Sequence, residues 1–182
     1  KDTDKAAANI RYLMQSAQAA RWMGAKRVVF HPGSPGGVSR EEAFTRVEAA
    51  LSVAVEALGG LLDEVALCPE TMGRAKQIGS LEETIALCKL DGRFIPTLDF
   101  AHLHARGRGA IQTEQDYADI LDRLEEGLGK ERAKRFHIHF AHIQYTDAGE
   151  KMHRTFADEG YGPDFAPLAR QLIRRGMEPV IV

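Results

Sequence analysis

The sequence lacks the features of secreted, membrane-spanning and dinucleotide-binding proteins. Its only cysteines, Cys68 and Cys88, lie in apolar segments, so two reduced core thiols are expected rather than a disulfide framework. No apolar stretch approaches the roughly 20 residues of a membrane helix, and no secretory signal is visible. A glycine-rich fingerprint follows none of the candidate strands, which argues against a Rossmann fold. These absences predict a cytoplasmic protein without a membrane partner.

The sequence also has little net charge and few signatures of known catalytic motifs. The formal net charge is −2, so binding to nucleic acid would need a local basic patch or metal ions. No helix carries His-Glu-x-x-His, and no convincing Ser/His/Asp order is present. Protease-like zinc chemistry and serine hydrolase chemistry are therefore not favoured.

The composition is that of a globular protein, with 44% hydrophobic and 27% charged residues. A length of 182 residues is sufficient for one domain with a real core, so residues 1–182 are expected to form a single domain. The sequence begins without Met and stops inside an apolar run, Pro179–Val182, which is typical of a strand cut short. We therefore expect a fragment of a longer domain.

Apolar periodicity predicts helices that alternate with short strands. The expected helices cover 2–23 (capped by Asp2 or Thr3), 39–58, 80–88, a segment around 117–124, and 164–175 with Leu168, Leu172 and Ile173 inward. The expected strands cover 27–30, 65–68, 94–98, 135–141 and 178–182, with polar loops over 104–112 and after 141. This alternation predicts right-handed βαβ units and a parallel sheet. The expected fold class is α/β, a (β/α)8 TIM barrel present as a partial barrel that lacks its first strands and the end of the last.

Potential metal ligands follow the predicted strands, where the mouth of a barrel would lie. Asp99 ends an apolar run and His102 comes three residues later, while His31, Glu70 and His139 end the other strands. His137 and His139 share one face, and we choose His139 because it is nearer the mouth. The loop after residue 141 adds Glu150 and His153. Mixed imidazole and carboxylate ligands suit zinc, manganese or iron(II).

This ordered set resembles the endonuclease IV family, the zinc-dependent apurinic/apyrimidinic endonucleases within the xylose-isomerase-like barrels. The resemblance is carried by His31-Pro-Gly, Glu70-Thr, Asp99-Phe-Ala-His102, His139 at a strand end, His153, and Gly160-Tyr-Gly-Pro-Asp. It spans essentially the whole chain.

The resemblance implies a DNA-repair hydrolase that cleaves the backbone 5′ to an abasic site with a metal-held hydroxide. Glu70 would be catalytic and would bridge two metals, with His31 on one and Asp99 and His139 on the other. His102 and His153 would hold a third. The implied cofactor is Zn²⁺, two or three ions, with Mn²⁺ as an alternative, and the implied partner is double-stranded DNA with abasic sites, bound by a monomer.

Three departures from the family pattern affect the ligand set. The family has an earlier histidine ligand that would precede Lys1 and a bridging glutamate that would follow Val182. It also has an aspartate two residues before the loop histidine, where this chain has Lys151. Glu150 is one residue away and is the better substitute, and Asp147 is the poorer one, so the number of metals stays two or three.

Five basic side chains lie in loops on the presumed active face and could contact phosphates, namely Arg74, Lys76, Arg106, Arg108 and Arg154. The alternative for these residues is a set of solvated loop charges. A sugar isomerase or epimerase on the same barrel is the second functional hypothesis, and its chemistry needs one metal and an acid/base pair. A degenerate barrel that serves as a binding module is the third.

Overall fold

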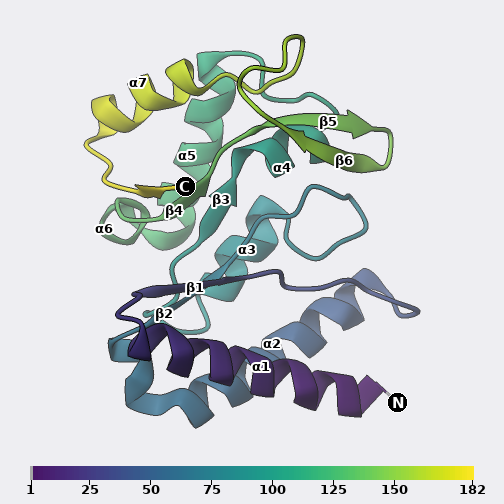
Figure 1. Ribbon diagram of the computed structural model, residues 1–182, viewed down its shortest axis with the longest axis vertical. Coiled ribbons are helices and arrows are strands. Elements are labelled where there is room, and N and C mark those ends of the chain that lie inside the picture. Colours follow the sequence, from purple (N-terminus) through teal and green to yellow (C-terminus); the bar gives the residue numbers. More distant parts are fainter. Residues whose placement is uncertain (1) are drawn as a thin grey trace.

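The computed structural model describes residues 2–182, with side chains from residue 7 onward, and shows helices packed around short parallel strands (Figure 1). The helices are α1 (Asp2–Trp22), α2 (Arg40–Leu58), the 3-10 helix η1 (Gly59–Asp63), α3 (Leu81–Cys88), α4 (Phe100–Arg106), α5 (Glu114–Leu128), α6 (Lys130–Ala133) and α7 (Phe165–Arg175). The strands are β1 (Arg27–Phe30), β2 (Ala66–Pro69), β3 (Thr97–Asp99), β4 (His137–His139), β5 (His142–Thr146), β6 (Gly149–Arg154) and β7 (Val180–Ile181).

Five strands run parallel in the spatial order β1-β2-β3-β4-β7. β1 pairs with β2, and β4 pairs with both β3 and β7. A parallel bridge between Glu70 and Thr97 joins β2 to β3. Among residues 2–182, β1 and β7 have a partner on one side only, so the sheet stays open. The predicted partial barrel is confirmed, and all five strands deliver their carboxyl ends to the same edge.

One hydrophobic cluster holds the strands against the helices. Leu67, Leu98 and Ile138 from the strands are fully buried and belong to the same cluster as Leu121 from α5 and Leu168 from α7. Burying each such side chain contributes about 1.5–3 kcal/mol. The sheet is thereby fixed in shape beneath the edge where the candidate ligands emerge.

Both cysteines are buried free thiols, as the sequence predicts, and Cys88 belongs to this cluster. Burial raises the pKa of Cys68 to about 12, although the Arg27 guanidinium opposes the shift. Burial also raises the pKa of Cys88. Neither thiol is therefore available as a nucleophile at neutral pH.

Helix starts follow the expected capping chemistry. The Ser39 side chain accepts the backbone N–H of Glu42, and Ser80 and Glu83 form a reciprocal capping box at α3. The predicted cap of α1 at Asp2 or Thr3 lies outside the described side chains. In α7, Leu168 and Leu172 are buried, but the inward placement of Ile173 is wrong because its side chain is 80% exposed.

Two local predictions are also wrong. The polar segment after residue 141 is an antiparallel hairpin, β5–β6, rather than a loop. The predicted loop over 104–112 begins as helix, because α4 starts directly after Asp99 and continues to Arg106. Within the described part of the chain, none of the helices combines the length and apolar character needed to span a bilayer.

Candidate metal centre

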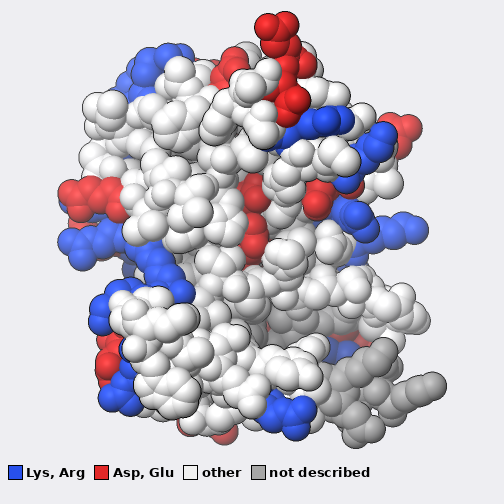
Figure 2. Space-filling model, in the orientation of Figure 1, with Lys and Arg blue, Asp and Glu red and all other residues white. Residues whose placement is uncertain are grey.

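The carboxyl ends of four strands meet at one cavity of about 610 Å³. His31 follows β1, Glu70 follows β2, Asp99 ends β3 and His139 ends β4. Acidic side chains lie in a hollow in the middle of this face, with basic side chains at its right-hand border (Figure 2). We call this space the metal cavity; it is also lined by His102, Glu150 and His153.

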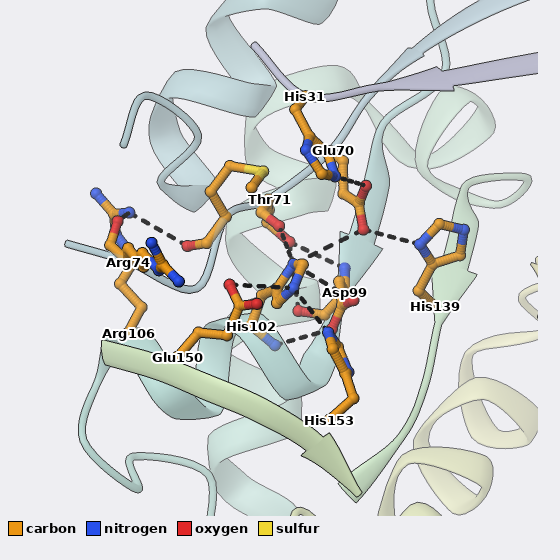
Figure 3. Close-up of polar contacts among 11 residues, drawn as sticks. His31, Glu70, Thr71, Arg74, Asp99, His102, Arg106, His139, Glu150 and His153 are labelled. Carbon is orange, nitrogen blue, oxygen red and sulfur yellow. Dashed lines mark hydrogen bonds and ion pairs between the residues drawn. The ribbon is translucent and has the colours of Figure 1, made fainter. Parts of the chain in front are cut away.

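Glu70 lies between His31 and His139, with one of these imidazoles on each of its carboxylate oxygens (Figure 3). Its Oε2 lies 3.2 Å from His31 Nε2, and its Oε1 accepts a hydrogen bond of 2.8 Å from His139 Nδ1. Burial opposes ionisation of Glu70, but the hydrogen bond from His139 and the nearby imidazoles together lower its pKa. The Glu70 contact in turn raises the pKa of His139. Glu70 is thus an ionised, buried carboxylate at the junction of two strands.

Asp99 both ends β3 and caps α4. Its Oδ1 accepts the backbone N–H of His102 at 2.8 Å, which is the N-cap bond of the helix. Its own backbone N–H donates to Thr71 Oγ1 at 2.9 Å. Because the cap and the strand fix the backbone on both sides, the Asp99 carboxylate is held toward Glu70 and His139 rather than toward solvent.

The ring of His102 is set in one tautomer. Its Nδ1 lies 2.8 Å from the Thr71 carbonyl oxygen, which can only accept, so Nδ1 carries the proton. The lone pair of Nε2 therefore points away from the helix, and it lies 3.2 Å from His153 Nε2. Two nitrogens that share a tetrahedral zinc at about 2.05 Å each lie about 3.3 Å apart. The separation of these two nitrogens fits a common cation.

Glu150 reaches the same place from β6. Its Oε2 lies 3.6 Å from His102 Nε2, and its backbone N–H donates to the Gly73 carbonyl at 3.1 Å. A Cβ at Gly73 would lie 2.6 Å from the Glu150 Cβ, so this close approach needs glycine. The side chain of Asp147 is 99% exposed and lies near Arg108 instead. Of the two carboxylates that the sequence left open, the geometry brings Glu150 to the histidines.

The ligand atoms form two adjoining groups that share Asp99. One contains Asp99, His102 and His153, the other contains Glu70, Asp99 and His139, and the ligand atoms within each group lie within 4.8 Å of one another. Burial raises the pKa of Asp99 to about 7; the N–H of His102 opposes the shift and the Glu70 carboxylate adds to it. Asp99 is thus a buried carboxyl group shared by two clusters that each combine imidazole and carboxylate ligands. The donor set therefore fits divalent metal, because buried charges in proteins are paired or coordinate metals.

His137 lies deeper in the barrel than His139, as expected. Its Nδ1 accepts from Arg27 Nη1 at 3.2 Å, and it does not line the metal cavity. Burial, with the nearby His139 and Arg27, lowers the pKa of His137 to about 4. A neutral imidazole that accepts from Arg27 belongs to the internal packing of the barrel, beneath the candidate ligands.

The five basic residues fall into different environments. Arg74 lines the metal cavity, while Lys76 and Arg108 are exposed in loops. Arg106 donates to backbone carbonyls of the loop after β2, including Arg74 O at 2.8 Å. Arg154 donates to Gln144 Oε1 at 2.7 Å, with its guanidinium 4.9 Å from the centre of the Tyr161 ring. Phosphate contacts by these residues stay predictions, and the geometry favours Arg74, Lys76 and Arg108 for them.

Thr71 and Gly73 position the candidate ligands, although the sequence did not predict a role for either of them. Thr71 bonds Asp99 through its side chain and orients His102 through its carbonyl oxygen. Gly73 lets the loop after β2 approach Glu150. The Glu70-Thr motif was a signal for Thr71, but nothing local marked Gly73, because its role depends on a strand some 75 residues later.

Parallel strands with helical crossovers define an α/β-barrel protein, and a rim of imidazoles and carboxylates lines the carboxyl ends of its strands. A family model described as "Xylose isomerase-like TIM barrel" matches residues 1–182. The chain belongs to this family.

Relatives with sequence similarity include an uncharacterized protein of Methanocaldococcus jannaschii, 35% identical over 152 residues, which cover 84% of this chain and 55% of that protein. A probable endonuclease 4 of Shouchella clausii is 28% identical over 138 residues, covering 71% of this chain and 44% of that protein. The chain thus spans about half the length of the relatives it matches.

Solved structures show the same fold. They include the IolI protein with a bound zinc atom (TM-score 0.73, 16% identity, 100% of this chain and 61% of that one). A D-tagatose 3-epimerase-like protein has a TM-score of 0.69 at 19% identity, and endonuclease IV from Thermus thermophilus has a TM-score of 0.61 at 20% identity. Each of these two matches covers 94% of this chain and 60% of the other.

Proposed function

We propose that this chain forms the metal-binding part of a phosphodiesterase that cleaves the DNA backbone 5′ to abasic sites. The observation that carries the proposal is the pair of ligand groups that share Asp99, with His31 added on Glu70. Together they offer more nitrogen and carboxylate ligands than one divalent ion needs, and multi-metal sites are typical of enzymes that cleave phosphodiesters. The similarity to probable endonuclease 4 sequences supports this choice.

The ligand residues would divide between neighbouring ions. His31, Glu70, Asp99 and His139 would hold one part of the centre, and His102, His153 and Glu150 the other. When bound, Zn²⁺ or Mn²⁺ would supply Lewis acidity for the phosphoryl group and make water nucleophilic at neutral pH.

The chain's own residues would orient these groups. Glu70 stays ionised between two imidazoles and would fix the position of the attacking water. The Thr71 carbonyl keeps the Nδ1 proton on His102, so that Nε2 stays free as a ligand.

The proposed partner is double-stranded DNA. Arg74 at the cavity wall would contact a phosphate close to the centre, and the exposed Lys76 and Arg108 would contact phosphates farther along the strand. The net charge of −2 gives no general attraction to DNA, so binding would depend on these local cations.

A sugar isomerase or epimerase is the second candidate, and the similarity to a D-tagatose 3-epimerase-like structure favours it. That reaction would use one metal, held by Glu70, Asp99 and His139, and would leave His102, His153 and Glu150 without a metal to bind. The metal count therefore separates the two candidates.

The test uses the full-length protein, metal analysis and nicking of a duplex with one abasic site. We expect two or three ions per chain and nicking that a chelator stops. Glu70→Gln should lower nicking by at least about a hundredfold, as for other groups that order reacting atoms, and should leave the fold intact. Glu126→Gln, an exposed glutamate on α5, is the matched control. One metal, no nicking and ketose–aldose interconversion would establish the second candidate instead.

A further inference from the structure

A second cavity lies beside the metal cavity, on the other strand of the hairpin. Its volume is about 460 Å³, within the range of about 300–1,000 Å³ that small-molecule sites occupy. We call it the tyrosine cavity, because Tyr117, Tyr145 and Tyr161 line it together with His104 and Gly162. None of these residues belongs to the candidate metal centre.

His104 offers this cavity one fixed hydrogen-bond donor. The side chain is 95% buried, since its exposed fraction is 5%, and its Nδ1 accepts the backbone N–H of Ile111 at 3.2 Å. Nε2 of the neutral ring must then carry the proton. Burial lowers the pKa of His104, so the ring is neutral at pH 7. No described residue accepts from this Nε2.

The open edge of the imidazole faces the cavity wall at Gly162. A Cβ there would stand 3.8 Å from His104 Nε2 and 3.9 Å from its Cε1, so a larger side chain would begin to cover the donor. Glycine leaves the N–H accessible from the cavity. Because this N–H is open to the cavity and has no acceptor among the described residues, a ligand in the cavity can accept from it.

Two other polar groups of the wall, Tyr117 and Gln144, add one uncharged acceptor and one uncharged donor. Tyr117 donates its O–H to the Asp164 carbonyl, so its oxygen can still accept. Gln144 accepts from Arg154 through Oε1, so its amide nitrogen can still donate. Among the described residues that line the cavity, none is Lys or Arg, and Asp164 carries a negative charge. No cationic side chain of the wall itself would pair with a phosphate or carboxylate, although the Arg154 guanidinium contacts the lining residues Gln144 and Tyr161.

Aromatic rings supply flat surfaces for an uncharged partner. Tyr145 lies edge-on to His104 with ring centres 5.4 Å apart, and its exposed fraction is 37%. The guanidinium of Arg154 covers one face of Tyr161, which leaves the other face for the cavity. Every nucleobase has a π-face that stacks on such rings, and its edge carries both acceptors and donors.

We propose that the tyrosine cavity binds an uncharged nucleobase, with His104 Nε2–H donating to a ring nitrogen or carbonyl oxygen of the base. The base could belong to a free nucleoside or to a nucleic acid, and the shared chemistry is the same. The proposal goes beyond the cleavage proposed above and does not depend on it.

The experiment titrates the full-length protein, with its bound metal, with deoxyadenosine and thymidine, and ligand-observed NMR measures the binding. We expect saturable binding that glucose does not reproduce. His104→Asn keeps an acceptor for the Ile111 N–H, but its shorter side chain cannot place a donor where His104 Nε2–H lies, so it should weaken binding about tenfold. Tyr161→Ala should weaken it similarly, whereas Tyr12→Ala, at an exposed tyrosine on α1, should not.

A further variant distinguishes loss of binding from loss of the fold. Gly162→Val keeps His104 and fills the space in front of it, so it should also weaken binding, with the melting temperature as the check on folding. Displacement of the nucleoside by a single-stranded oligonucleotide, but not by an abasic strand of the same length, would assign the base to nucleic acid. Binding of the nucleoside without such displacement would assign it to a free nucleoside.

Three results would overturn the proposal: no saturable binding, binding unchanged in both His104→Asn and Tyr161→Ala, or equal binding of glucose. Glu70→Gln separates this test from that of the proposed function. It should abolish nicking and leave nucleoside binding unchanged, because Glu70 does not line the tyrosine cavity.

Discussion

At the scale of single residues, the candidate ligands are positioned mostly by backbone groups. Asp99 is held by its cap bond to His102 and by the side chain of Thr71, and His102 is oriented by a carbonyl oxygen. Such bonds cost the ligand little conformational freedom, because the strand and helix already fix the backbone. The metal cavity is therefore preorganised by β3 and the start of α4.

Glu150 provides a test of which carboxylate completes the group around His102. Glu150→Gln removes one charge 3.6 Å from His102 Nε2 and should lower the affinity for one metal ion by about 10–100-fold. Asp147→Asn is the matched control, because its side chain is 99% exposed. Metal titration with a chelating dye measures both variants. A normal metal count in Glu150→Gln with a loss in Asp147→Asn would reverse the assignment.

The sequence indicates the candidate metal ligands, but it does not indicate most of the residues that position them. Histidines and carboxylates at strand ends can be recognised in the chain because strand ends recur at regular intervals. The choice between Glu150 and Asp147 could not be made in this way, since both lie in one polar segment. It depends on the contact between Gly73 and the hairpin, which joins residues far apart in sequence.

At the scale of elements, the conformation of the loop after β2 (residues 71–79) is stabilised by hydrogen bonds from two arginines, Arg106 and Arg40. Arg106 donates to the carbonyls of Met72, Arg74, Ala75 and Gln77, and Arg40 donates to two of the same carbonyls and to Glu83. Burial lowers the pKa of Arg106, yet its bonds to the loop remain those of a cation. The loop that carries Arg74 is thus held as a rigid wall of the metal cavity.

Arg106→Gln should loosen this loop. Loss of several charge-assisted bonds should raise hydrogen exchange of residues 71–79 by about tenfold or more, since each such bond contributes about 1.5–3 kcal/mol. Hydrogen exchange followed by mass spectrometry measures this rate. Arg108→Gln, at an exposed arginine, should leave the rate unchanged. If residues 71–79 exchange hydrogen at the same rate in wild type and in Arg106→Gln, then Arg106 does not hold this loop in place.

Glu83, which bonds Arg40 and the start of α3, should make the free energy of unfolding depend on pH in the acid range. Burial opposes ionisation, but the bonds from Arg40 and from the N–H groups of Ser80 and Gly79 lower its pKa in the folded state. A lowered folded pKa means that the stabilisation is present above the unfolded value of about 4.5 and is lost as pH falls through the folded value.

Glu83→Gln should therefore lower the free energy of unfolding by about 1–3 kcal/mol at neutral pH. The difference from wild type should shrink as pH falls below about 4. Urea denaturation at several pH values measures both effects, with Glu126→Gln as a control at an exposed glutamate. A difference that stays constant with pH would show that the Glu83 charge is not responsible.

The two elements that the sequence missed have weak local signals. The β5–β6 hairpin has only one fully buried side chain on β5, Ile143, so hydrophobic alternation is almost absent. The start of α4 has a weak signal because Asp99 ends an apolar run and is followed by an Arg/Gly-rich segment, although the same side chain is a helix cap.

At the scale of the whole molecule, one core connects the strands to helices from both halves of the chain. Leu98, at 0% exposure on β3, lies in this core. Leu98→Ala should lower the free energy of unfolding by about 2–5 kcal/mol, the usual range for a buried leucine. Ile173→Ala, at an 80% exposed position, should change it by less than about 0.5 kcal/mol. Denaturant titration compares the two, and similar losses would mean that the core is not centred on β3.

The order of strands and helices was the most predictable property of the molecule. The strands β1, β2 and β3 are short and mostly apolar, and α2, α3, α4 and α5 each begin with a side-chain cap, so much of the alternation is encoded locally. Alternation of this kind implies a parallel sheet, and the sheet places all strand ends at one edge. Residues directly after a strand are therefore brought to the mouth by topology alone, which is why the sequence is sufficient to propose candidate ligands.

The burial of both thiols has a practical consequence for labelling. Cys68 and Cys88 are buried, and burial raises the pKa of both thiols. Maleimide dyes should therefore not label the native protein. An Asp147→Cys variant, at the exposed tip of the hairpin, would then be labelled with a single fluorophore, and the two native cysteines would not need to be replaced. Such a reporter, next to the strand β6 that carries Glu150, would follow the uptake and release of ions in real time.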